Sequence, residues 1–186
     1  MFIRCMAIET DDAKVDSSII EIASCDLDIE TLTCANVIRT YVAPQNDLEL
    51  AYTKITEKDL EGAPSLEEAL KRFEGAEYYA AHHFLHLRYY LSGFGKNWIN
   101  TEFCGFKLVS RPRISKWPDL AEKFGLAAEV WEHKSSETEK LAIFSAHYLG
   151  VIFETDKCSI QKLVNMSITD DVFPEYRPED VIHDEF

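Results

Sequence analysis

Apolar residues alternate with polar ones, or run without a break, over three stretches near the start of the chain. Residues 2–9, 19–27 and 35–42 are rich in β-branched and other apolar side chains, and clusters of Asp, Ser and Thr separate them. This pattern is typical of strands joined by short polar connections. It predicts a three-stranded antiparallel meander.

Helical spacing of apolar residues then takes over. It predicts helices at residues 56–60, 65–73, 83–91, 116–124 and 135–149, with a last turn at 160–164. Ser65 and Glu68 have the spacing of a capping box at the start of the second helix. Short apolar runs at 77–81 and 98–101 predict two more strands. The order of elements predicts an α/β fold of the three-layer, ribonuclease-H-like type, with a mixed five-stranded sheet and helices on both faces.

Composition fits one compact domain. The 186 residues are 46% apolar, which is enough for a full core. We assign residues 1–166 to the domain and residues 167–186 to an acidic tail. The chain has no run of eighteen apolar residues and no signal-like segment at its start. Its five scattered cysteines include no C-x-x-C pair, so we expect reduced thiols and a cytoplasmic protein without membrane contact.

Charge disfavours one class of function. The net charge of -14 repels polyanions, so we expect weak nucleic-acid binding or none. The tail adds to the excess, since its seven acids face only Arg177 as a fixed positive charge. Pro174 and Pro178 prevent a helix there. We expect an extended tail that docks on a protein partner or folds back on the domain.

Several motifs, in a shared order, resemble the DnaQ-like family of DEDDh 3′-5′ exonucleases, and most closely its exonuclease X type. The segments that carry the resemblance are 3–10 (Ile-Arg-Cys-Met-Ala-Ile-Glu-Thr), 19–24 (Ile-Ile-Glu-Ile-Ala-Ser), 55–57, 63–64, 79–82 (Tyr-Ala-Ala-His) before a helix, 98–99 (Trp-Ile) before a helix, and His133 before the long helix. They extend over most of the chain, from Phe2 to Leu149. The resemblance implies the same fold as the residue pattern.

The family holds two Mg²⁺ or Mn²⁺ ions with four carboxylates, and a histidine acts as general base for the attacking water. Transferred to this chain, the four carboxylate positions are Ala7, Glu9, Leu87 and Thr138, and the base is His133. Only Glu9 and His133 retain the family's residues. One carboxylate cannot hold a pair of hard cations, so we expect no cofactor and a catalytically degenerate domain, a pseudo-exonuclease retained for binding or protein interaction.

Two alternatives would preserve hydrolysis at DNA or RNA ends. Other acids could replace the lost ones, namely Asp11, Asp12, Glu137 and Glu139. A one-residue step on a helix turns a side chain by about 100°, so we expect these acids at the surface. A different metal such as zinc could also bind an imidazole-rich set formed by Glu9, His83, His86 and His133. Against this stands the ordinary packing role of histidines, which we favour for His82 and His86.

Binding of a nucleic-acid end without cleavage is a further alternative. The candidate residues are Lys107, Arg111 and Arg113, close to Trp117, because cations beside an aromatic ring can hold a strand end. A basic loop that balances an acidic domain explains them equally well. The sequence also leaves open whether the domain is a monomer or forms a homodimer through a surface helix.

Overall fold

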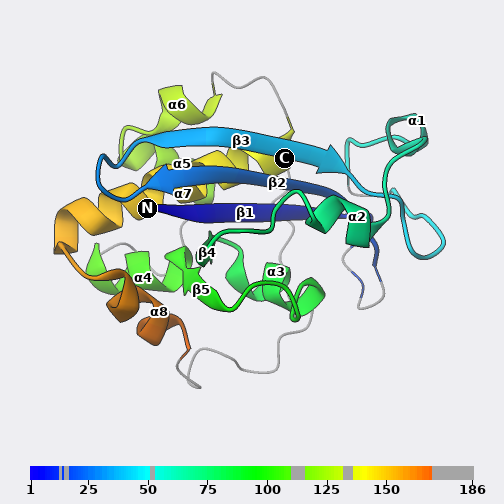
Figure 1. Cartoon of the computed structure of the whole chain (residues 1–186). Coiled ribbons are helices and arrows are strands. Elements are labelled where there is room, and N and C mark those ends of the chain that lie inside the picture. Colours follow the sequence, from blue (N-terminus) through cyan, green and yellow to red (C-terminus); the bar gives the residue numbers. More distant parts are fainter. Residues whose placement is uncertain (13, 15–16, 51–52, 110–115, 132–135, 169–186) are drawn as a thin grey trace.

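One five-stranded sheet organises the chain (Figure 1). The computed structural model describes residues 1–12, 14, 17–50, 53–109, 116–131 and 136–168. The strands, in the spatial order β3-β2-β1-β4-β5, are β1 (Phe2–Thr10), β2 (Ile19–Asp28), β3 (Cys34–Tyr41), β4 (Tyr78–Ala81) and β5 (Asn97–Asn100). β1, β2 and β3 are antiparallel neighbours, whereas β4 and β5 run parallel to β1. The predicted meander and mixed sheet are confirmed.

Helices form the outer layers. They are α1 (Glu57–Leu60), α2 (Leu66–Leu70), α3 (Phe84–Tyr90), α4 (Thr101–Leu108), α5 (Trp117–Lys123), α6 (Ala127–Trp131), α7 (Glu137–Asp156) and α8 (Ile160–Ser167). The residue pattern did not predict α6, and α7 extends seven residues beyond its predicted end. Buried Ile152 continues the apolar side of α7, and the helix ends only where Lys157 adopts a left-handed conformation with φ 49°.

The starts of the helices have local causes in the sequence. At α2, the Ser65 hydroxyl accepts a hydrogen bond from the Glu68 amide while the Glu68 carboxylate accepts one from the Ser65 amide. This is the predicted capping box. At α7, the Ser136 hydroxyl accepts from the Glu139 amide. These caps fix where each helix begins, and the second one sets the position of Glu137 and Thr138.

Alternation along β1 divides the core into two clusters on opposite faces of the sheet. Ile3, Cys5 and Ala7 belong to the cluster that contains the buried residues of α7. Met6 and Ile8 belong to the other cluster, together with residues of α3 and the segment after α2. In Figure 1, α7 crosses behind the sheet and α2 lies in front of it. β2 lies inside the sheet and is buried on both faces, whereas β3 forms an exposed edge.

The helix layer behind the sheet is closely packed. Gly105 of α4 lies so near the ring of Tyr148 on α7 that an added Cβ would overlap the phenol. The Ser167 hydroxyl at the end of α8 accepts a hydrogen bond from the Asn100 amide at 2.8 Å. α8 therefore ends one residue beyond the expected domain boundary, and residues 169–186 of the tail lie outside the described residues. Among the described helices, none has the length and apolarity needed to cross a membrane.

Candidate functional site

The residues at the family's first carboxylate motif lie at the end of β1. Glu9 is opposite Glu21 in the antiparallel ladder, and Ala7 is opposite Ala23. Side chains two residues apart on a strand share a face, so Glu9 lies on the same face as Ala7, which is the face covered by α7. Glu9 at the C-terminal end of β1 and the first turn of α7 therefore form one site, which we call the acidic end.

Three carboxyl groups influence one another at the acidic end. The pKa of Glu9 is raised from its ordinary value of 4.5 to about 7, mostly by burial and then by the charges of Glu21 and Glu137. Glu137 is half-buried, with 29% of its side chain exposed. Glu137 is thus partly at the surface, but our expectation that it lies away from the site is wrong, because its charge is close enough to act on Glu9.

One of these acids has its own cation. The buried Glu21 carboxylate accepts a hydrogen bond and forms an ion pair through Oε1 with the Arg39 guanidinium of β3. Its other oxygen, Oε2, is buried and has no hydrogen-bond partner among the described residues. The Arg39 guanidinium also lies 4.6 Å from the centre of the Tyr41 ring, which holds it in place. Glu21 is thereby neutralised at close range, whereas Glu9 receives two carboxylate charges.

At the three other carboxylate positions the structure has buried side chains without charge. Ala7 and Thr138 are each 3% exposed, and Leu87 is 1% exposed. Leu87 packs with Met6, Ile8 and the other residues of the cluster on the α3 side. All three side chains serve the packing of the domain.

The described histidines have separate surroundings. His82 is buried, its Nδ1 lies 3.2 Å from the Thr101 hydroxyl, and its ring meets that of Phe144 edge-on. The packing role expected for His82 is confirmed. His83 is exposed at the start of α3, and His86 is half-buried against the Tyr90 ring. Within the described parts of the chain, no three His, Cys, Asp or Glu side chains are arranged to hold a metal ion. His133 lies outside those parts.

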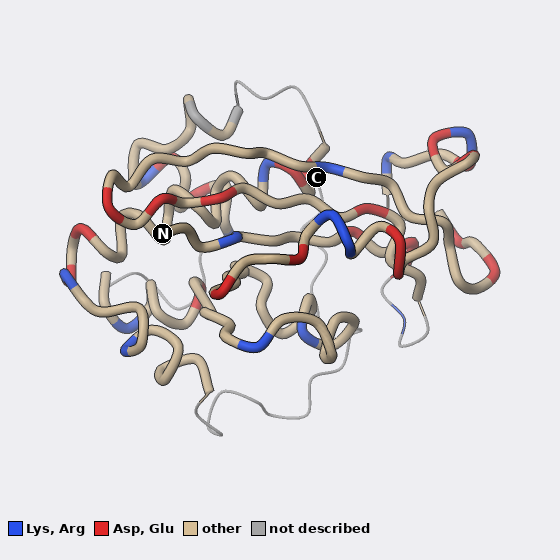
Figure 2. The backbone as a smooth tube through the Cα atoms, viewed as in Figure 1, with Lys and Arg blue, Asp and Glu red and all other residues tan. Residues whose placement is uncertain are grey.

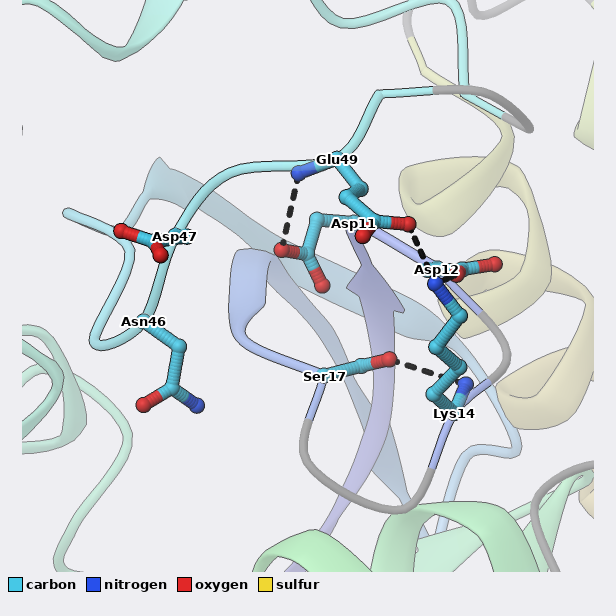
Figure 3. A pocket seen from close by; sticks show the side chains of 7 residues that line it. All are labelled: Asp11, Asp12, Lys14, Ser17, Asn46, Asp47 and Glu49. Atoms are coloured by element: carbon cyan, nitrogen blue, oxygen red, sulfur yellow. Dashed lines mark hydrogen bonds and ion pairs between the residues drawn. The ribbon is translucent and has the colours of Figure 1, made fainter.

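A polar pocket of about 570 Å³ adjoins the acidic end (Figure 3). Its lining consists of Asp11, Asp12, Lys14, Ser17, Asn46, Asp47 and Glu49. The Lys14 ammonium lies 2.9 Å from the Asp12 carboxylate and also pairs with Glu49. These two partners, Glu49 first, raise the pKa of Lys14. The pocket thus surrounds one cation with several acids.

The acids that follow β1 are not surface residues. Asp11 is 2% and Asp12 6% exposed. Asp11 accepts hydrogen bonds from the backbone amides of Ser18 at 2.8 Å and Glu49 at 3.5 Å, so it holds two loops together. Glu139 on α7 is half-buried as well. The expectation of solvated acids is therefore wrong for Asp11 and Asp12, which the loops cover, whereas Glu137 and Glu139 remain partly exposed.

The expected basic site is only partly described. Lys107 is exposed near the end of α4, where its ammonium lies 5.4 Å from the centre of the Phe103 ring. Lys107 is six residues after the start of α4, or about 9 Å along the helix axis. Arg111 and Arg113 lie outside the described residues. Along the described chain, Figure 2 shows basic positions scattered among acidic ones, with no continuous basic stretch.

Sequence reasoning missed Glu21 and Arg39 as parts of the site. Glu21 belongs to one of the segments that carry the family resemblance but to none of its metal motifs, and Arg39 belongs to neither. The feature of the sequence that could have revealed them is the register of the predicted strands. Once residues 2–9 and 19–27 are antiparallel neighbours joined by a short loop, a glutamate near the start of the second strand lies opposite one near the end of the first.

Comparison with known proteins identifies the architecture. No protein-family model and no curated protein matches the chain. Among solved structures, exonuclease X in complex with 5′-overhanging duplex DNA has a TM-score of 0.73 and 22% identity, over 89% of this chain and 99% of that one. The nuclease domain of 3′hExo, a DEDDh family member bound to rAMP, has a TM-score of 0.62 and 20% identity, over 84% and 93%. Cell-death related nuclease 4 has a TM-score of 0.60 and 12% identity, over 82% and 64%. The chain therefore has the mixed-sheet, ribonuclease-H-like fold of the DnaQ-like DEDDh exonucleases.

Proposed function

We propose that this chain is a pseudo-exonuclease, a DnaQ-like domain that does not hydrolyse phosphodiesters by the two-metal mechanism and is retained for binding. The observation that carries the proposal is the burial of Ala7, Leu87 and Thr138 at three of the family's four carboxylate positions. These side chains have no metal-binding oxygen carrying a negative charge, which Mg²⁺ and Mn²⁺ require. Because the losses are spread over three motifs, no single substitution restores the set.

The acids that remain do not fit a pair of divalent cations. Metal ligands must be deprotonated, and Glu9, with a pKa of about 7, holds its proton about half of the time at neutral pH. Glu21 is engaged by Arg39, whose positive charge repels a cation. Two metal ions would have to compete with a proton at one carboxylate and with a guanidinium at the other.

For the binding role we propose a protein partner with a basic segment. The net charge of -14 favours a cationic partner, and the pocket in Figure 3 already surrounds the Lys14 ammonium with carboxylates. A lysine or arginine side chain of a partner has the same chemistry as the group that occupies the pocket. The acidic tail would extend this attraction beyond the domain.

A rewired exonuclease is the second candidate. The observation in its favour is that Glu9, Glu21 and Glu137 act on one another electrostatically at the family's site, so carboxylate density there has not vanished. A metal ion that entered would lower the pKa of Glu9 and could recruit His133 as base. Hydrolysis of this kind needs Glu9 as a ligand.

A nuclease assay separates the two candidates. We expect no shortening of 3′-labelled or 5′-labelled single-stranded DNA and RNA with Mg²⁺, Mn²⁺ or Zn²⁺, and exonuclease X in separate, parallel DNA reactions is the positive control. Glu9→Gln and His133→Ala serve as site variants, and Glu67→Gln, an exposed acid on α2, is the matched control. Product formed by the wild type and by Glu67→Gln, but by neither site variant, would establish the rewired enzyme and overturn the pseudo-exonuclease.

A binding assay tests the proposed partner class. A fluorescent peptide rich in arginine and lysine should bind the wild type, bind Asp47→Asn/Glu49→Gln several-fold more weakly, and bind Lys14→Ala more tightly because the internal cation is gone. Glu67→Gln should match the wild type. Equal affinity for all four proteins would rule out the pocket as the binding site.

Nucleic-acid ends are the competing ligands in that assay. Binding of a single-stranded 3′ end that weakens in Lys107→Ala, Arg111→Ala and Arg113→Ala, and that falls steeply with salt, would replace the basic segment as the ligand. We expect no such binding at physiological salt.

A further inference from the structure

A second chemical cluster lies on the α7 face of the sheet, away from the acidic end. Cys5, Cys25 and Cys34 belong to the three adjacent strands β1, β2 and β3, and Cys5 and Cys25 are direct partners in the ladder. Cys34 is opposite Leu27, so it lies diagonally across from Cys25 on the same face. His147 of α7 forms a hydrogen bond with the Cys34 thiol.

The thiols of this cluster differ in access and in charge. Cys5 and Cys25 are buried, whereas Cys34 is half-buried at the start of the edge strand β3. The Cys25 and Cys34 thiols are near enough for each to shift the pKa of the other. An acceptor for the Cys25 proton is the Ala35 carbonyl oxygen, 3.7 Å from Sγ. A half-buried cysteine thus lies diagonally across from a fully buried one.

Electrostatics favour the thiolate at Cys34. Hydrogen bonding from Cys25, followed by the hydrogen bond and charge of His147, lowers the pKa of Cys34 to about 6 although burial opposes this. The same contact with Cys34, together with burial, raises the pKa of Cys25. Thiolates are the reactive form of cysteine, so the accessible member of the pair carries the negative charge at neutral pH.

We propose that Cys34 is a peroxide-sensitive thiol, with His147 as its positioning residue and Cys25 as its resolving thiol. The Cys34 thiolate attacks one oxygen of hydrogen peroxide, the O–O bond breaks, and hydroxide leaves while Cys34 becomes a sulfenic acid. The Cys25 sulfur then attacks the Cys34 sulfur, water leaves with the Cys25 proton, and a disulfide forms. Two thiols are oxidised by two electrons, and the peroxide is reduced to water.

The surrounding backbone permits this closure. A disulfide brings two sulfurs to about 2.05 Å, and the β2–β3 register places Cys25 and Cys34 diagonally across from each other on one face of the sheet. A register shift interrupts the β2–β3 ladder between Ser24 and Asp26, beside Cys25, and β3 has a strand neighbour on one side only. β3 can therefore move toward β2 without displacing another strand.

Cys158 provides an internal control. It is also half-buried, but burial and the nearby Asp156 carboxylate raise the pKa of its thiol. The two thiols are similarly buried, but their pKa values are shifted in opposite directions. A faster reaction of Cys34 than of Cys158 therefore reports the influence of Cys25 and His147.

The experiment is peroxide treatment of the full chain at neutral pH, followed by alkylation in denaturant and peptide mass spectrometry. We expect two of the five cysteines to lose their free thiols, with a Cys25–Cys34 linked peptide 2 Da lighter than its parts. In Cys25→Ser, a dimedone adduct should form at Cys34, and in Cys34→Ser no disulfide should form. His147→Gln should slow the oxidation of Cys34 several-fold, while Cys158→Ser should behave like the wild type.

Reactivity before oxidation gives a second measurement. In the native protein, iodoacetamide should label Cys34 several-fold faster than Cys158, the gain in thiolate being partly offset by lower intrinsic nucleophilicity. Circular dichroism of each variant excludes unfolding as the cause of a change. Labelling of Cys158 as fast as Cys34, or a peroxide-treated protein in which Cys25 and Cys34 remain free, would overturn the proposal.

Discussion

The two ends of one strand pair have the same geometry and different chemistry. On the α7 face of the β1–β2 ladder, Glu9 is opposite Glu21, and four residues away Cys5 is opposite Cys25. At each end, a residue of β3 contacts the β2 member, Arg39 at the acids and Cys34 at the thiols. At the acidic end, β3 supplies a cation that engages only one acid. At the thiol end, Cys25 of β2 helps to stabilise the negative charge of the Cys34 thiolate on β3.

The comparison shows that chemistry at a sheet position depends on what the neighbouring strand supplies. Glu9 and Glu21 are direct partners, yet Glu21 lies against Arg39 while the pKa of Glu9 is raised to about 7. The Cys25 and Cys34 thiols act on each other, yet their pKa values move in opposite directions. At the acidic end, the arginine of the edge strand neutralises one of the clustered acids.

Arg39→Ala at the acidic end should cause the largest loss of stability. Glu21 is buried, and removal of its cation leaves an uncompensated charge in the core, which typically costs about 3–5 kcal/mol. Urea unfolding at pH 7 measures the loss. Arg39→Ala/Glu21→Gln should recover most of it, since no buried charge then remains. A loss below about 1 kcal/mol in Arg39→Ala would mean that Glu21 does not depend on Arg39.

Glu9→Gln should change how stability depends on pH. The pKa of Glu9 is raised from 4.5 to about 7 in the folded protein, so between these values the folded state keeps a proton that the unfolded chain releases. Stability therefore falls as pH rises through this window, and the full loss, about 3 kcal/mol, is reached above pH 7. Glu9→Gln has no such loss.

Urea unfolding from pH 4 to pH 8 measures this difference. The variant and the wild type should be similarly stable near pH 4, and the variant should become the more stable protein above pH 7. Glu67→Gln, on the exposed face of α2, should parallel the wild type throughout. Parallel curves for wild type and Glu9→Gln would show that Glu9 ionises normally.

Gly105→Ala should disturb α7, the helix that both ends share. A Cβ at Gly105 would overlap the Tyr148 ring, and overpacking of this kind costs about 1–3 kcal/mol. Gly150→Ala on α7 is the matched control, because its Cβ would lie 3.7 Å from Leu27 Cδ1, in ordinary contact. That substitution should leave stability unchanged or raise it by up to about 1 kcal/mol through helix propensity. Thermal unfolding of the two variants measures whether Gly105→Ala lowers the stability and Gly150→Ala does not.

The sequence predicted the meander and the short strands because those depend on local patterns. Alternation over residues 2–9 and the polar breaks around it act within a few residues. The capping box at Ser65 is equally local, and it formed as predicted. Helix α6 escaped prediction because it is only five residues long and, unlike α1 and α2, is not preceded by a Ser or Thr that could cap it.

The site was predictable only where position follows from a motif. Ala7, Glu9, Leu87 and Thr138 could be placed by their order along the chain. The effect of Glu21 on Glu9 and the Glu21–Arg39 ion pair both depend on the register of three strands. The pattern of one strand does not specify that register. The burial of Asp11 depends on the backbone amides of two loops, and no local pattern predicts that these loops come together.

Cys5→Ala should have the smallest effect, and it sharpens the comparison at the thiol end. Cys5 is fully buried among apolar neighbours and acts there as a small hydrophobic group, so loss of its sulfur should cost about 1 kcal/mol. Cys34 labelling by iodoacetamide should stay at the wild-type rate, because Cys25 and His147 are untouched. A slower rate in Cys5→Ala would mean that the whole row of thiols, rather than the Cys25–Cys34–His147 contact, sets the charge on Cys34.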